Sequence, residues 1–168
     1  MRNLASKVGV TPAALYHHFK DKDELYADAV SHAFEQKTAD IKTVMAAEEE
    51  PMKRLEVFVG WFVRALNKDQ DFQKLLQRVM LDSDPQRMQK LTKTTFLELF
   101  SAIQNLGESF KSKYDPHLLA ISIIGLVLYH FETSSVRSLL PGSRAAHGKA
   151  DTIARHVTSL LENGLLTH

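Results

Sequence analysis

Apolar residues recur along this chain at the three- and four-residue spacing that places them on one face of an α-helix. Separate stripes with this spacing run over residues 55–66, 72–80, 88–106 and 153–161. No window of comparable length alternates polar and apolar residues as a β-strand does. The pattern therefore predicts an all-α fold.

Prolines indicate where several of these helices begin. Pro51, Pro85, Pro116 and Pro141 divide the chain into blocks of helix length, and proline fits the first turn of a helix because its missing N–H has no partner there. We expect helices over residues 2–8, 12–18, 22–46, 51–67, 70–81, 86–110, 116–139 and 149–163. The helix over 22–46, with a rise of about 1.5 Å per residue, is long enough to belong to two domains.

The first two predicted helices are separated by a turn of characteristic composition. Gly9 can adopt the left-handed conformation that ends a helix. Thr11 is a good N-cap, and Pro12 suits the first helical position. Two short helices joined by a turn of this kind form a helix-turn-helix motif. In this motif the N-terminal residues of the second helix enter the major groove of DNA. Here these residues are Thr11, Pro12 and Ala13. An ordinary helical hairpin uses the same turn, so the turn alone leaves both interpretations open.

The formal net charge of +1 hides an uneven distribution of charge. Residues 1–22 contain four basic side chains and one acidic side chain, whereas residues 23–168 contain 17 basic and 19 acidic side chains. Around the motif, Arg2, Tyr16, His17 and Lys22 are candidates for contact with DNA phosphates. The basic excess therefore coincides with the predicted DNA-binding unit.

The order of residues across this segment identifies a protein family more specifically than the turn does. The positions that carry it are Leu4-Ala5, Gly9-Val10, Leu15-Tyr16, His18-Phe19, Lys22 and Leu25. This run closely resembles the DNA-binding segment of the TetR family of transcriptional regulators. The resemblance implies base contacts around residues 11–13 and phosphate contacts from residues 16, 17 and 22. It also implies a DNA-binding domain over residues 1–26 and a helical effector-binding and dimerisation domain over residues 27–168.

Members of that family have a further helix before the motif, and this sequence begins without it. In the family that helix packs against the helix-turn-helix, so its loss removes apolar cover from several large side chains. The side chains affected are Leu4, Val8, Leu15, Phe19 and Leu25. We therefore expect a truncated chain in which DNA binding is weakened.

Aromatic residues concentrate in three of the predicted helices of the second domain. Together with neighbouring aliphatic residues they can line an apolar cavity for a small hydrophobic effector. The candidate lining residues are Phe58, Trp61, Phe62, Leu76, Met80, Phe96, Phe100, Ile103, Tyr129 and His130. Plain core packing is the better explanation for each of them when taken alone, and the resemblance favours the effector site.

Two helices near the C-terminus are candidates for contact with a second copy of the chain. The segment from Leu118 to Phe131 is apolar nearly all round, which predicts a helix buried on most sides. The resemblance implies a homodimer joined by a four-helix bundle. The candidate interface residues are Leu118, Ser122, Gly125, Ile153, Val157, Leu160 and Leu161. Packing within one subunit is the alternative explanation.

Other kinds of chemistry find little support in the sequence. The chain has no cysteine, P-loop, Rossmann glycine pattern or zinc-protease motif, so we expect no metal, no cofactor and no enzyme. Its longest apolar run is 14 residues, against about 20 for a membrane span, which predicts a soluble cytoplasmic protein. The resemblance implies a homodimeric repressor that binds a double-stranded DNA operator and is released by its effector. The alternative is a dimeric helical module that binds a ligand or a protein without reading DNA.

Overall fold

The computed structural model describes residues 1–110 and 114–166, which form helices and no strands. The α-helices are Arg2–Val8 (α1), Pro12–His18 (α2), Lys22–Thr38 (α3), Ile41–Ala47 (α4), Pro51–Lys68 (α5), Gln70–Met80 (α6), Pro85–Leu91 (α7), Leu97–Ser109 (α8), Pro116–Glu132 (α9), Ser134–Arg137 (α10) and Ala150–Leu166 (α11). A π-helix, Thr92–Phe96 (η1), joins α7 to α8, and a 3-10 helix, Ala145–Gly148 (η2), precedes α11. The predicted all-α fold is confirmed.

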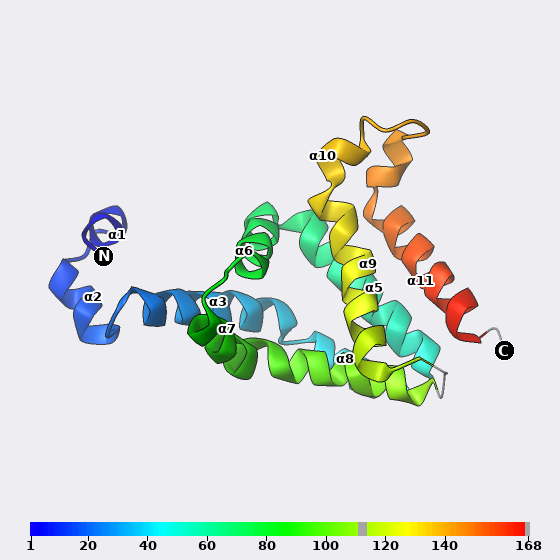
Figure 1. The fold of residues 1–168 in the computed structure, drawn as a ribbon, viewed down its shortest axis with the longest axis horizontal. Coiled ribbons are helices and arrows are strands. Elements are labelled where there is room, and N and C mark those ends of the chain that lie inside the picture. Colours follow the sequence, from blue (N-terminus) through cyan, green and yellow to red (C-terminus); the bar gives the residue numbers. More distant parts are fainter. Residues whose placement is uncertain (111–113, 167–168) are drawn as a thin grey trace.

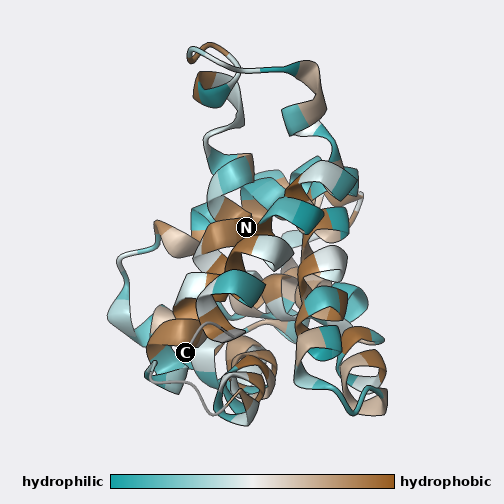
Figure 2. Ribbon diagram, turned by 90° about the vertical axis from the view of Figure 1, so that its right-hand side faces the viewer, coloured by the Kyte–Doolittle hydropathy of each residue, from teal (hydrophilic) through white to brown (hydrophobic). Residues whose placement is uncertain are grey.

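The molecule is elongated, with a small pair of helices at one end and a larger helical body at the other (Figure 1). Helices α1 and α2 form the small end, and α3 leads from them into the body. The segment that contains α10 and η2 projects from the far side of the body. Viewed from the body end, the apolar residues lie mostly between the helices of the body (Figure 2).

The helix starts follow the chemistry that the sequence indicates. Pro12, Pro51, Pro85 and Pro116 each occupy the first turn of a helix. Side-chain oxygens cap three of these helix starts, and also those of α3 and α6, by accepting backbone N–H groups that lack a helical partner. The capping residues are Thr11, Asp21, Asp69, Asp84 and Asp115. Pro141 lies in a turn and begins no helix.

Helix α5 is the centre of the core. Its predicted apolar stripe of Leu55, Phe58, Val59, Phe62 and Leu66 is buried throughout. Helices α4, α6, α8, α9 and α11 all pack against it. The charged side chains of this region stay at the surface, because no polar or charged residue is buried among the described residues. The hydrophobic effect of this shared stripe is what holds the body together.

The single helix predicted over 22–46 is wrong, because the structure divides it into α3 and α4 at residues 39 and 40. The indole N–H of Trp61 donates to the carbonyl oxygen of Lys37 at 3.1 Å, and in an unbroken helix that carbonyl accepts from Ile41. The hydroxyl of Thr38 also donates to the Phe34 carbonyl. Both side chains compete with the helical hydrogen bonds at the same point, so the helix is interrupted there.

The helices predicted over 86–110 and 116–139 are also more complex than the pattern indicates. The first is continuous but contains the π-helical turn η1 between α7 and α8. The second ends at Glu132, where Thr133 donates its hydroxyl to the carbonyl of Tyr129, and the short α10 follows. No described helix is long and apolar enough to cross a membrane.

Candidate nucleic-acid interface and ligand cavity

Helices α1 and α2 form the helix-turn-helix that the sequence predicts. Gly9 ends α1 with a φ of +73°, and its N–H donates to the carbonyl of Ala5. The left-handed conformation favours glycine at this position because other residues carry a Cβ that clashes there. Thr11 then caps α2 by accepting the N–H of Ala14 at 3.2 Å, with Pro12 next in the chain.

The N-terminal end of α2 is open to solvent. Thr11, Pro12 and Ala13 are exposed, and no residue of α2 is buried. Because the hydroxyl of Thr11 is engaged in the cap, its methyl group is the part left to meet a base edge. The remaining candidates for DNA contact are also exposed: Arg2, Tyr16, His17 and Lys22. The predicted DNA-contacting residues therefore share one accessible end of the molecule.

The apolar side chains of this unit have little cover. Leu4 is 40% exposed, Val8 58% and Val10 43%, and Ala5 is the one buried residue in α1. Leu15 and Phe19 are only half-buried. Leu25 is half-buried too. Apart from Val10, these are the side chains that the sequence predicts to lack cover, so few apolar contacts hold the helix-turn-helix together.

The body contains an apolar cavity of about 280 Å³. Helices α3, α5, α6, α7, η1, α8 and α9 all contribute to its wall. Its lining residues are Phe34, Phe58, Trp61, Phe62, Phe72, Leu76, Met80, Met88, Thr92, Thr95, Phe96, Leu99, Phe100, Ile103 and Ile124. One hydroxyl in the wall is already engaged, since Thr95 Oγ1 lies 2.6 Å from Ser31 Oγ. The space therefore suits an apolar ligand.

Most of the predicted cavity residues do line this space. They are Phe58, Trp61, Phe62, Leu76, Met80, Phe96, Phe100 and Ile103. Sequence reasoning missed Phe34 and Phe72, whose rings lie 5.2 Å apart. It also missed the threonines of the π-helix. Phe34 lies at the end of an apolar stripe on α3 that also contains Ala27 and Val30. This helical spacing indicates that Phe34 faces the interior, so the sequence alone could have identified it as a candidate.

The prediction that Tyr129 and His130 line the same cavity is wrong. Helix α9 presents Ile124 to the cavity instead. Tyr129 is 67% exposed on the outside of the helix, and the ring of His130 lies 5.9 Å from that of His156 on α11. Positions 124 and 129 are five residues apart, which places them on different faces of the helix.

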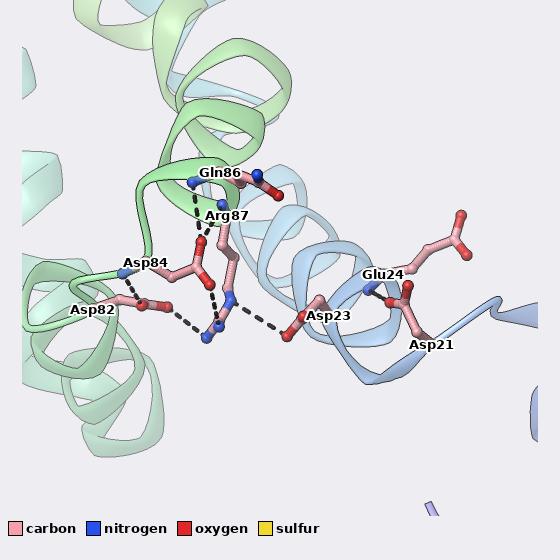
Figure 3. Close-up of polar contacts among 7 residues, drawn as sticks. All are labelled: Asp21, Asp23, Glu24, Asp82, Asp84, Gln86 and Arg87. Carbon is pink, nitrogen blue, oxygen red and sulfur yellow. Dashed lines mark hydrogen bonds and ion pairs between the residues drawn. The ribbon is translucent and has the colours of Figure 1, made fainter.

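A charged cluster connects the wall of the cavity to the start of α3 (Figure 3). The guanidinium of Arg87 on α7 lies 2.9 Å from Asp82, 3.2 Å from Asp84 and 3.4 Å from Asp23. Asp82 and Asp84 belong to the segment between α6 and α7, whereas Asp23 is the second residue of α3. The same guanidinium lies 5.5 Å from the centre of the Tyr26 ring.

The electrostatics of this cluster favour its ionised form. The backbone N–H of Arg87 and the guanidinium charge hold the pKa of Asp84 below its ordinary value, against the effect of desolvation. Burial, followed by the charge of Asp82, raises the pKa of Tyr26, whose hydroxyl is buried without a hydrogen-bond partner. Asp84 also accepts the N–H groups of Gln86 and Arg87, as expected of a capping residue.

The predicted dimer residues fall into two groups. Leu118 is 64% exposed and Leu160 50%, and Ser122 and Gly125 are exposed beside them. These four residues are accessible to a second copy of the chain. The other predicted interface residues are not, because they are buried within the same chain, where α11 packs on α5: Ile153, Val157 and Leu161. For these three the predicted role in the dimer interface is wrong. Their four-residue spacing forms the inner face of α11. Ile121 and Tyr129 on α9, which the prediction omitted, are 51% and 67% exposed.

Comparison with known proteins adds to this picture. Residues 1–29 match the model of bacterial regulatory proteins of the tetR family. The nucleoid occlusion factor SlmA of Shewanella oneidensis is 24% identical over 103 residues, which make up 61% of this chain and 52% of SlmA. The chain thus spans about half the length of the curated relatives it matches.

Solved structures resemble the whole fold. The transcriptional regulator FadR from Bacillus subtilis in complex with stearoyl-CoA has a TM-score of 0.71 at 14% identity, covering 92% of this chain and 84% of FadR. A transcriptional regulator of the TetR/AcrR family from Thermobifida fusca has a TM-score of 0.66 at 20% identity, covering 97% and 85%. At these identities the similarity shows the fold alone.

Proposed function

We propose that the chain is a transcriptional regulator of the TetR family, and that it is a repressor that a small apolar effector releases from DNA. Its first helices match the family model, and its fold is similar to that of a TetR/AcrR regulator. Regulators of this family are transcription factors and not enzymes. The observation that carries the proposal is the pairing of an exposed helix-turn-helix with an aromatic cavity in one chain.

We assign DNA recognition to residues 1–26. Thr11, Pro12 and Ala13 are the proposed base-contacting residues, because the start of the second helix enters the major groove in this motif. The proposed phosphate contacts come from Arg2, Tyr16, His17 and Lys22. The net positive charge of residues 1–22 supports this assignment, since most of the affinity for DNA comes from phosphate contacts. Since the proposed partner is a DNA operator, we also propose a cytoplasmic location.

We assign effector binding to the cavity within residues 27–168. Aromatic rings dominate its wall, and both cavity threonines come from the π-helix, a type of turn that is frequent at functional sites. A volume of about 280 Å³ lies near the lower end of ordinary ligand pockets. FadR, which shares the fold, binds stearoyl-CoA. We therefore propose a fatty acyl chain or a similar flexible apolar molecule as the effector.

The Arg87 cluster is the proposed connection between the two sites. Met80 and Met88 line the cavity immediately before and after the segment that holds Asp82 and Asp84. A ligand that displaces these methionines moves Arg87, which contacts Asp23 one residue after the start of α3. Because α2 leads directly into α3, a shift at Asp23 changes the position of the recognition helix.

A homodimer is proposed through the outer faces of α9 and α11. Leu118, Ile121, Tyr129 and Leu160 expose apolar surface there, and Gly125 has no atom within 4 Å of the position that a Cβ would occupy. A second copy can approach closely at such a point. Two-fold symmetry sets two recognition helices about 34–36 Å apart, which is one turn of DNA.

The test of DNA reading is selection of binding sites from a pool of random duplexes, followed by measurement of affinity at several salt concentrations. We expect a near-palindromic site and an affinity that falls steeply with salt. Equal retention of all sequences contradicts the proposal. With thermal stabilisation by apolar ligands, that outcome favours the dimeric module that does not read DNA.

The connection is tested with Asp23→Asn, using Asp28→Asn on the same helix as the matched control. Asp23 contacts Arg87, whereas Asp28 is exposed and contacts no part of the cluster. We expect both variants to bind decanoic acid as the unmodified chain does, and decanoic acid to release DNA from D28N but not from D23N. Equal release from both variants contradicts this route.

A further inference from the structure

A second cavity, separate from the aromatic one, lies where α9, α10, η2 and α11 meet. Its volume is about 340 Å³. The lining residues are His130, Arg137, His147, Thr152, Ile153 and His156. All but Ile153 carry a polar side chain, and none of them is acidic. The lining therefore offers several hydrogen-bond donors and no carboxylate to balance their charge.

The side chain of Arg137 forms part of this wall. One of its terminal nitrogens, Nη1, donates to the carbonyl oxygen of His147 at 2.8 Å, but its Nε is buried without a hydrogen-bond partner. Within residues 1–110 and 114–166, no ion pair involves Arg137. A guanidinium with no carboxylate beside it can still form charge-assisted hydrogen bonds with an anion.

The histidines add donors to the same space. The rings of His130 and His156 meet edge to face with centres 5.9 Å apart. Nδ1 of His147 accepts the backbone N–H of Arg144 at 3.3 Å, which leaves Nε2 of the neutral ring as a donor. Burial lowers the pKa of His130 first, and the charges of Arg137 on α10 and His156 on α11 lower it further. The charged forms of these groups therefore repel one another in the empty cavity.

A metal ion does not fit this arrangement. Among the described residues no group of three or more His, Asp or Glu side chains is placed to hold one, and a nearby guanidinium opposes a cation. An anion has the opposite effect, since it supplies acceptors and neutralises the repulsion. We propose that this cavity binds a compact anion with two or more negative charges, held by Arg137 and by the imidazoles of His130 and His156.

This site does not rest on DNA binding or on the apolar effector. Phosphate and carboxylate groups share the required chemistry, so the two probes are inorganic phosphate and citrate, each compared with sodium chloride at equal ionic strength. The readout is the protonation of each histidine in ¹⁵N-labelled protein, followed by NMR as the pH is raised. We expect the probe to keep His130 protonated to higher pH, because an anion stabilises its charged form. His32, which is exposed on α3 and outside the cavity, is the internal control.

Variants of two neighbouring arginines locate the site. Arg137→Gln removes the cavity guanidinium, and we expect it to weaken the binding of the probe by about tenfold or more, since charge-assisted hydrogen bonds are the strong ones. Arg144→Gln is the matched control, because its side chain is outside the cavity lining and the backbone N–H to His147 remains.

A stronger response to citrate assigns the site to carboxylates, and a stronger response to phosphate assigns it to phosphates. No shift of His130 with either anion overturns the proposal, and so does an equal loss of affinity in R137Q and R144Q. The shift of His130 in the unmodified chain decides the question even where R137Q fails to fold.

Discussion

Phe58→Ala is the substitution that best distinguishes a ligand cavity from an ordinary gap in the core. Phe58 is 1% exposed and forms part of the cavity wall. Removing a buried phenyl ring costs about 3–5 kcal/mol of unfolding free energy, which for a chain of this length corresponds to a fall in Tm of roughly 6–20 °C. The space that the ring leaves joins the cavity of about 280 Å³ that is already present.

An apolar ligand is expected to recover part of this loss. At about a hundred times its Kd, a ligand that binds only the folded state returns about 2.7 kcal/mol. Decanoic acid is therefore expected to raise the Tm of F58A, and the rise is measured by thermal unfolding followed by circular dichroism.

Leu55→Ala is the matched control for this experiment. Leu55 lies on the same helix, is fully buried, and does not line the cavity. Its truncation is expected to cost about 2–5 kcal/mol, but Leu55 is not part of the cavity wall. L55A is therefore expected to gain the same rise in Tm from decanoic acid as the unmodified chain, and F58A a larger one, because its cavity is larger. No rise in any of the three proteins, or the same rise in all three, refutes the assignment of the cavity to an effector.

Three further predictions concern DNA contact, assembly and pH. Tyr16→Ala is expected to weaken DNA binding to all sequences alike, as measured by fluorescence anisotropy, and a change in site preference contradicts its role as a phosphate contact. Gly125→Arg is expected to give a folded monomer by analytical ultracentrifugation, because no atom of the same subunit opposes a side chain there; a persistent dimer places the interface elsewhere. Asp69→Asn is expected to lower the unfolding free energy at neutral pH, because Lys37 and the N–H of Phe72 hold the pKa of Asp69 below 3.8. Since a lowered pKa stabilises the fold only while the carboxyl is ionised, the difference between the two proteins is expected to vanish in urea unfolding as the pH falls through the folded-state pKa.

Helical periodicity and capping chemistry predict the elements of this fold well. The start of α2 at Thr11 and Pro12 and the buried stripe of α5 around Phe58 are both as the sequence indicates. These features depend on residues within a few positions of one another. For the same reason, most of the cavity wall could be predicted, since aromatic residues at helical spacing must face a common interior.

The features that the sequence did not reveal depend on distant contacts. Trp61 interrupts the helix at Lys37, 24 residues away, and no local pattern contains that hydrogen bond. The approach of Arg87 to Asp23 likewise joins two helices far apart in the chain. The periodicity of apolar residues also predicts which residues share one face of a helix, but it does not predict which other helix packs against that face. This explains why Tyr129 was assigned to the cavity although it points outward, and why Val157 was assigned to the dimer although it is buried on α5.

The position of Trp61 has a practical consequence for spectroscopy. It is the only tryptophan in the chain, so all indole emission comes from one known place. Its ring stacks on Phe62 in the cavity wall, and its N–H holds the carbonyl at the junction of α3 and α4. The fluorescence of the unlabelled protein can therefore report, without any introduced dye, both the filling of the cavity and a movement of the helix that leads to DNA.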